Sequence, residues 1–129
     1  MPLRVLVVDD DDVARELLGS ILRAAGHQVL ELPSPIGVSR VAREKRVDVV
    51  VLDVFLPGMK GDRLAQLLRG NAVFEHLGVV LVTGDAALDL EQLAVRVGAD
   101  AVVNKSSANA GLCRAVELAA RRRARKSSE

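Results

Sequence analysis

The sequence predicts an α/β fold of the doubly wound class, in which a five-stranded parallel sheet lies between two layers of helices as a three-layer sandwich. Two observations lead to this prediction. Five apolar segments of strand length alternate with five amphipathic segments of helix length, and this alternation indicates right-handed βαβ units and a parallel sheet. Half of the residues are apolar and only 2% are aromatic, which is typical of helices packed on strands rich in branched residues.

Length and charge indicate one folded domain. The 129 residues match the size of a single domain, and the formal net charge of +1 excludes a highly charged, disordered chain. Residues 121–129 hold five Lys or Arg and one Glu, which leaves 13 basic and 16 acidic residues, a charge of −3, in residues 1–120. We therefore predict a domain over residues 1–120 and a basic C-terminal tail over residues 121–129 that continues the last helix. The tail is expected to be a solvated helix end, although it could form a docking or nucleic-acid patch.

Each predicted strand is a short apolar run that ends in polar residues. The central run, VDVVVL, is almost continuously apolar, as expected for a strand that is covered on both faces. The second run is weaker. The strands are expected at Leu3–Val8, Gln28–Leu32, Val47–Leu52, Gly78–Val82 and Ala101–Val103.

Capping residues and glycines mark the predicted helices. Asp12 is expected to cap the first helix, with Asp11 beside it, and Gly26 to end it. One face of that helix is expected to carry Val13, Leu17, Ile21 and Ala25, which recur every four residues. Ser34 followed by Pro35 predicts the start of the second helix, which should run to about residue 45. The remaining helices are expected at Asp62–Arg69, Leu88–Val97 and Ser107–Arg125.

Several function classes are disfavoured by residue types that the chain lacks. There is no Trp or Tyr, so stacking of nucleic-acid bases is not expected and nucleic acid is not a predicted partner. The single cysteine, Cys113, cannot form an internal disulfide or a multi-cysteine metal site, which favours a reducing, cytoplasmic location. No apolar run approaches the ~20 residues of a membrane span. No Gly-rich nucleotide-binding motif is present.

Polar residues at the ends of four predicted strands indicate a site at one edge of the sheet. In an open parallel sheet, ligands bind beyond the carboxyl ends of the strands. The first strand delivers Asp9 and Asp10 to this edge, the third Asp53, the fourth Thr83 and the fifth Lys105. Each residue alone has an ordinary explanation as a polar strand end. Together, three carboxylates this close need a cation to stay ionised, and Mg²⁺ prefers such oxygen ligands.

Four motifs together resemble the receiver domain of two-component response regulators, in particular the chemotaxis-type single-domain regulators. The motifs are VLVVDDD, VVVLDVFLPGMKG, VVLVTGD and GADAVVNK, and the resemblance extends from Leu3 into the last helix. It implies the strand order 2-1-3-4-5 and a receiver domain over residues 1–120. It also implies a function in phosphorelay signal transduction through protein–protein contact.

The resemblance gives each strand-end residue a role. Asp53 would be the phosphoacceptor, taking a phosphoryl group from a phosphohistidine of a sensor histidine kinase or phosphotransfer protein. Thr83 would be the switch hydroxyl and Lys105 the lysine that pairs with the phosphate. The cofactor Mg²⁺ would be held by Asp9, Asp10, Asp53 and the backbone carbonyl of Phe55. Such a protein is not an enzyme for a separate substrate, because it catalyses only its own phosphorylation and dephosphorylation, and its downstream protein partner is not identified by the sequence.

The chain departs from the family pattern around Lys105. Val102 stands where the family usually has Tyr or Phe, so there is no ring to couple to Thr83. Ser106 stands where the family usually has Pro, and Ser107 stands in place of an aromatic residue. The pocket thus matches a phosphoacceptor, whereas the usual switch surface is altered.

Three alternative functions stay open. The chain could be a receiver excised from a hybrid kinase or a multidomain regulator. It could be a degenerate receiver that acts as a phosphorylation-independent interaction module, which the altered switch positions favour and the acidic pocket disfavours. A phosphatase with an Asp nucleophile would need a second acid two residues further on. Asp11 follows Asp9 at that distance, but Phe55 follows Asp53.

Overall fold

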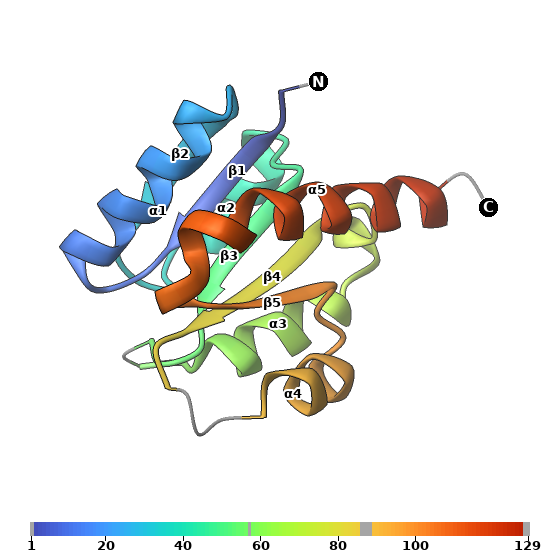
Figure 1. Cartoon of the computed structure of the whole chain (residues 1–129). Helices are drawn as coiled ribbons and strands as arrows, with labels where there is room; N and C mark the ends of the chain where they lie inside the picture. Colours follow the sequence, from blue (N-terminus) through green and yellow to red (C-terminus); the bar gives the residue numbers. More distant parts are fainter. Residues whose placement is uncertain (1, 57, 86–88, 128–129) are drawn as a thin grey trace.

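A parallel sheet organises the computed structural model, which describes residues 2–56, 58–85 and 89–127. Within these residues, five strands form one sheet in the order β2-β1-β3-β4-β5, and each neighbouring pair is parallel (Figure 1). The predicted fold class and strand order are confirmed. The strands are β1 (Arg4–Val8), β2 (Gln28–Leu32), β3 (Val49–Asp53), β4 (Gly78–Thr83) and β5 (Ala101–Asn104).

Helices cover both faces of the sheet, with α1 and α5 on one face and α2, α3 and α4 on the other (Figure 1). The described helices are α1 (Asp12–Ala24), α2 (Val38–Glu44), α3 (Gly61–Arg69), α4 (Leu90–Val97) and α5 (Ala108–Ser127). Two short 3-10 turns, η1 (Ala72–Phe74) and η2 (Lys105–Ser107), precede β4 and α5.

The central strands contribute to two separate cores, because successive side chains of a strand point to opposite faces. In β1, Leu6 and Val8 pack toward α2, α3 and α4, whereas Val5 and Val7 pack toward α1 and α5. All four side chains are fully buried. Burial on both faces explains why these strands are continuous apolar runs in the sequence.

The cap of α1 lies one residue earlier than predicted. The Asp11 carboxylate accepts a hydrogen bond from the backbone N–H of Val13 at 3.1 Å and is the N-cap, while Asp12 is the first helical residue. The prediction of Asp12 as the cap was wrong. Both acids still lie where they favour the positive end of the helix dipole.

The buried face of α1 also differs from the prediction. Leu18 and Leu22 face the core and are at most 2% exposed, whereas Val13 is 75% and Leu17 48% exposed. Of the predicted series, Ile21 is partly buried against the same core. The predicted series and the buried series both repeat every four residues and lie side by side on the helix. The four-residue period alone therefore does not tell which of the two series contacts the sheet.

Helix α2 begins later than predicted, at Val38 instead of Ser34. The Ser34 hydroxyl accepts a hydrogen bond from the N–H of Ile36 at 3.2 Å, which forms a local turn and not a helix start. Gly37 then adopts a φ of 88° as the residue before the helix. This left-handed conformation is readily accessible to glycine, and it separates the turn from the helix.

The fourth helix starts at Leu90, with Asp89 as its N-cap, because the Asp89 carboxylate accepts a hydrogen bond from the N–H of Gln92 at 3.1 Å. The predicted first residue, Leu88, lies outside the described residues. Among the residues that the structure describes, no helix is both long and apolar enough to cross a membrane.

The start of the basic stretch is anchored to the folded body through Asp100, which is 4% exposed. The carboxylate of Asp100 accepts hydrogen bonds from the Arg123 guanidinium, including Nε at 2.9 Å, and from the N–H of Val79 at 2.9 Å. Its backbone carbonyl accepts a further bond from Arg122 at 2.7 Å. Arg123 is therefore not a solvated side chain, although the domain boundary at residue 120 stays a prediction.

We predict that Asp100→Asn lowers the free energy of unfolding by about 2–4 kcal/mol, because it leaves the Arg123 guanidinium partly buried without its charge partner. Urea denaturation would measure the change. The matched control is Glu44→Gln, which breaks an exposed ion pair with Arg40 on α2. The control should change stability by less than about 0.5 kcal/mol. Equal, small losses in both variants would contradict the structural role of Asp100.

Candidate functional site

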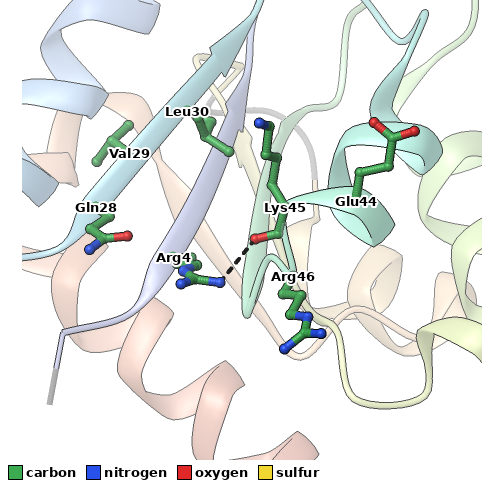
Figure 2. A pocket seen from close by; sticks show the side chains of 7 residues that line it. All are labelled: Arg4, Gln28, Val29, Leu30, Glu44, Lys45 and Arg46. Carbon is green, nitrogen blue, oxygen red and sulfur yellow. Dashed lines mark hydrogen bonds between the residues drawn. The ribbon is translucent and has the colours of Figure 1, made fainter.

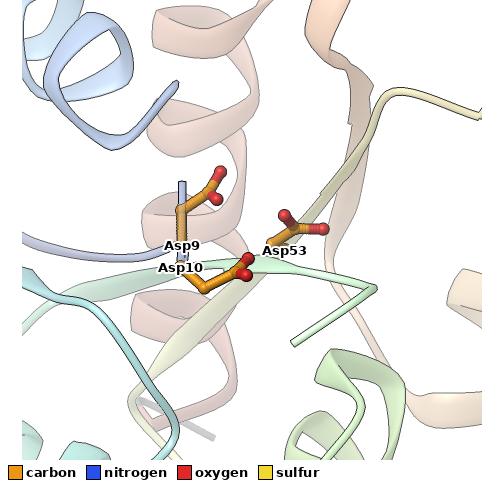
Figure 3. A group of neighbouring side chains, drawn as sticks. All are labelled: Asp9, Asp10 and Asp53. Atoms are coloured by element: carbon orange, nitrogen blue, oxygen red, sulfur yellow. The ribbon is translucent and has the colours of Figure 1, made fainter. Parts of the chain in front are cut away.

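Three carboxylates meet at the carboxyl edge of the sheet, as Figure 3 shows for Asp9, Asp10 and Asp53. One oxygen from each lies within 4.8 Å of the others. Asp9 directly follows β1 and Asp53 ends β3, and these two strands are neighbours in the sheet. Asp9 is 0% and Asp53 5% exposed, whereas Asp10 is exposed. The structure thus brings together the three predicted acids.

Lys105, which directly follows β5, brings a positive charge to the three carboxylates. Its Nζ lies 2.8 Å from Oδ2 of Asp53 and 2.8 Å from Oδ2 of Asp9. Burial alone would lower the pKa of the Lys105 ammonium, but the two carboxylates outweigh burial and raise it above its ordinary value. Lys105 therefore stays charged and balances part of the acidic cluster.

The carboxylate of Asp9 is buried next to a second carboxylate, that of Asp53. Burial raises its pKa above the ordinary value, and the nearby charge of Asp53 raises it further. The hydrogen bond from the N–H of Asp11 at 3.0 Å and the charge of Lys105 only partly offset this effect. Oδ2 of Asp9 is buried and accepts no hydrogen bond of good geometry, although Lys105 is close. A buried carboxylate oxygen in this state, beside two more carboxylates, fits a hard divalent cation such as Mg²⁺.

The carboxylate of Asp53 is held at both oxygens. Oδ1 accepts a hydrogen bond from the backbone N–H of Phe55 at 2.9 Å, and Oδ2 accepts one from Lys105 at 2.8 Å. The Phe55 ring is 49% exposed beside the site. Its backbone carbonyl stays a predicted metal ligand.

Gly61 also belongs to the site, although in the sequence it is marked only as the last residue of the motif VVVLDVFLPGMKG. It is the first residue of α3, and its N–H donates to the carbonyl of Val54 at 2.9 Å. A Cβ atom at this position would collide with the backbone carbonyl of Asp53. Glycine is therefore required for α3 to approach the strand end that carries Asp53. The Gly in the MKG segment was the only sequence signal for this contact.

Thr83 lies at the same edge, fully buried at the end of β4. Its Oγ1 accepts a hydrogen bond from the N–H of Asp85 at 3.1 Å. Among the described contacts it makes no hydrogen bond to Asp53 or Lys105. The bond from Asp85 occupies a lone pair of the hydroxyl and leaves its own proton available for another acceptor.

The altered positions near Lys105 are packed or hydrogen-bonded locally. Val102 is partly buried against the core under α2, α3 and α4, and it pairs with Leu81 of β4. Ser106 donates to the side-chain oxygen of Asn104 from its N–H at 2.9 Å and from its hydroxyl at 2.7 Å. These contacts tie the segment after β5 to itself.

A separate hollow of about 450 Å³ lies at the opposite, amino-end edge of the sheet (Figure 2). In it, Arg4 donates from Nη1 to the carbonyl of Lys45 at 3.4 Å. The residues that line this hollow are Arg4, Gln28, Val29, Leu30, Glu44, Lys45 and Arg46. None of them belongs to the acidic cluster, so this hollow is not the predicted site.

Comparisons with known proteins find response regulators that are similar to this chain. Response regulator protein FleR of Pseudomonas aeruginosa is 35% identical over 99 residues, which cover 77% of this chain and 20% of FleR. The polar-differentiation response regulator DivK of Brucella anthropi is 26% identical over 105 residues, covering 81% of this chain and 85% of DivK. The solved structure of the Vibrio cholerae chemotaxis protein CheY4 shares the fold, with a TM-score of 0.81 at 23% identity over 92% of this chain and 99% of that one.

The model of the response regulator receiver domain family matches residues 5–117, which include all the residues of the acidic cluster and Lys105. The chain therefore belongs to the family of receiver domains of two-component response regulators.

Proposed function

We propose that this receiver accepts a phosphoryl group on Asp53 from a histidine kinase or phosphotransfer protein, and then signals by contact with a downstream protein. The observation that supports this most directly is the Asp53 carboxylate, held by Phe55 and Lys105 beside two further carboxylates. We further propose that Asp9, Asp10, Asp53 and the Phe55 carbonyl hold Mg²⁺. The cytoplasmic location stays a prediction.

The proposed reaction is an in-line transfer. One oxygen of Asp53 attacks the phosphorus of a phosphohistidine, the phosphorus–nitrogen bond breaks, and its electron pair stays on the imidazole, which takes up a proton. The product on this chain is an acyl phosphate. Mg²⁺, when bound, would neutralise charge on the transferring phosphoryl group. Lys105 is close enough to Asp53 to pair with an oxygen of that group.

The hydrogen bonding of the Thr83 hydroxyl supports a role for this residue as a sensor of the phosphoryl group. Its hydroxyl already accepts from the N–H of Asp85, so its proton can be donated to a phosphoryl oxygen once one is present. Movement of Thr83 toward Asp53 would pull on the segment that follows β4, part of which lies outside the described residues.

A second candidate function is a receiver module within a larger regulator or hybrid kinase. It is favoured by the observation that the chain spans one fifth of the length of FleR. The sequence of the full gene would test it. A phosphorylation-independent interaction module is a third candidate, and the phosphorylation assay below separates it from the first.

We predict that Asp53→Asn abolishes phosphorylation and leaves the fold intact, because an amide cannot form the acyl phosphate. The wild type should gain one phosphate with Mg²⁺ and acetyl phosphate, as read by intact mass. The matched control, Asp85→Asn, removes an exposed carboxylate at the same edge and should still gain one phosphate. A wild type that gains none would favour the phosphorylation-independent module, and a phosphorylated Asp53→Asn would refute Asp53 as the nucleophile.

We predict that Asp9→Asn stabilises the metal-free protein at neutral pH, raising Tm by about 3 °C or more. The pKa of Asp9 lies above its ordinary value of 3.8, so between the two values the folded protein keeps a proton that the unfolded chain has lost. The stability that this proton gives the metal-free protein is therefore lost as pH rises through that window. Asp9→Asn should also weaken the rise in Tm that Mg²⁺ gives the wild type.

Thermal unfolding with and without Mg²⁺ would test this, with Asp10→Asn as the matched control. Asp10 is exposed, so its loss should weaken the response to Mg²⁺ without raising the metal-free Tm. A lower metal-free Tm in Asp9→Asn, or an unchanged response to Mg²⁺, would contradict the prediction.

We predict that phosphorylation changes the amide hydrogen exchange of residues 83–90 and leaves that of residues 101–107 nearly unchanged. Residues 86–88 lie outside the described part. Val102 is stiff, packed and carries no ring that could turn toward Thr83, and Ser106 is tied to Asn104. Amide hydrogen exchange with and without beryllofluoride, a phosphoryl mimic, would measure the change. A large protection change centred on residues 102–107 would show that this segment switches despite the missing ring.

A further inference from the structure

Arg15 links the acidic cluster to its surroundings through the backbone. Its side chain is only 16% exposed, although it lies on α1 near the protein surface. Nη1 donates to the backbone carbonyl of Asp9 at 2.8 Å, and Nη2 donates to the carboxylate of Asp12 at 2.6 Å. Nε lies 3.5 Å from Oε1 of Glu31 on β2. The planar guanidinium is therefore oriented by two acids while it holds one carbonyl.

The position of the Asp9 carbonyl affects the position of Asp10, because this carbonyl belongs to the peptide that joins Asp9 to Asp10. A peptide unit is planar, so a hydrogen bond to this carbonyl fixes the direction in which the chain continues into Asp10. The carboxylate of Asp10 makes no hydrogen bond or ion pair of its own within the described part of the chain. Its place in the acidic cluster therefore depends on its backbone. Arg15 holds that backbone at the carbonyl of Asp9, and the Asp9 carboxylate holds it at the N–H of Asp11.

The charge of Arg15 is satisfied away from the cluster. Asp12 and Glu31 are both within ion-pair distance of its guanidinium. Glu31 is shared with Arg23, whose Nη2 lies 2.9 Å from the other carboxylate oxygen. Arg15 thus contacts the backbone of Asp9 and is already paired, whereas Lys105 is the cation that contacts the carboxylates. The two basic residues have separate tasks.

We propose that Arg15 is a positioning residue for the metal site: by holding the carbonyl of Asp9 it orients the peptide to Asp10 and so sets the affinity of the acidic cluster for Mg²⁺. This inference rests on the proposed function, because it assumes that the cluster binds Mg²⁺. It assigns Arg15 no contact with the phosphoryl group, so its effect should fall on metal affinity and not on the transfer step.

The test compares Arg15→Gln and Arg15→Lys with the matched control Arg23→Gln. Arg23 shares Glu31 with Arg15 but contacts neither Asp9 nor Asp10. The Kd for Mg²⁺ would be measured from the amide chemical shifts of residues 9–12, which also show whether each variant is folded. Phosphorylation by acetyl phosphate would then be measured at saturating Mg²⁺.

Arg15→Gln should weaken Mg²⁺ binding about tenfold, the lower end of the loss expected for an outer-shell partner. Arg15→Lys keeps one donor for the carbonyl but loses the fork, so its loss should be smaller, about threefold. Arg23→Gln should bind Mg²⁺ like the wild type. At saturating Mg²⁺, Arg15→Gln should be phosphorylated at a rate within about twofold of the wild type, whereas general damage to the fold would slow this step as well.

Mg²⁺ binding by Arg15→Gln within twofold of the wild type would overturn the inference and leave the proposed function standing. An equal loss in Arg23→Gln would also overturn it, because the effect would then arise from Glu31 and not from the carbonyl of Asp9. A wild type that shows no response to Mg²⁺ would instead overturn the proposed metal site, and this inference with it.

Discussion

The repulsion among three carboxylates at one edge of the sheet is the constraint around which the site is arranged. Lys105 offsets part of it, because its ammonium lies 2.8 Å from an oxygen of Asp9 and 2.8 Å from one of Asp53. These residues come from three different strand ends, and a parallel sheet places all of its carboxyl ends at the same edge. The order β2-β1-β3-β4-β5 puts the two buried acids on neighbouring strands. The fold thus creates both the crowding of the acids and the access of Lys105 to them.

The sequence could predict this cluster because its logic is topological. A polar residue that directly follows a buried strand lies at the edge of the sheet whatever the details of packing. For this reason the sequence predicts one site for Asp9, Asp53 and Lys105, and the structure brings these residues together. Thr83 reaches the same edge, but the hydrogen bond that its hydroxyl accepts comes from the N–H of Asp85 and not from the cluster.

Other features depend on tertiary packing and could not be predicted from local patterns. The two neighbouring four-residue series on α1 are equally periodic, and only contact with the sheet selects the one that contains Leu18. The pair of Asp100 with Arg123 joins residues that are 23 positions apart and has no motif. The hydrogen bond from Arg15 goes to a backbone carbonyl. Because every residue has a backbone carbonyl, the sequence does not indicate which one Arg15 contacts. At the start of α2, two local signals indicate different first residues. Ser34 and Pro35 indicate an early start, but the left-handed conformation of Gly37 places the start at Val38.

The position of Gly61 shows that a residue with no reactive side chain can be as intolerant of substitution as a nucleophile. Any side chain there would press on the carbonyl of Asp53, the residue proposed to carry the phosphoryl group. In a saturation mutagenesis of this chain, position 61 would accept glycine alone, and its pattern of tolerated residues would resemble that of a reacting side chain. A mutational scan read without the structure would then count Gly61 among the reactive residues. Its real contribution is the space that lets α3 lie against the strand end of β3.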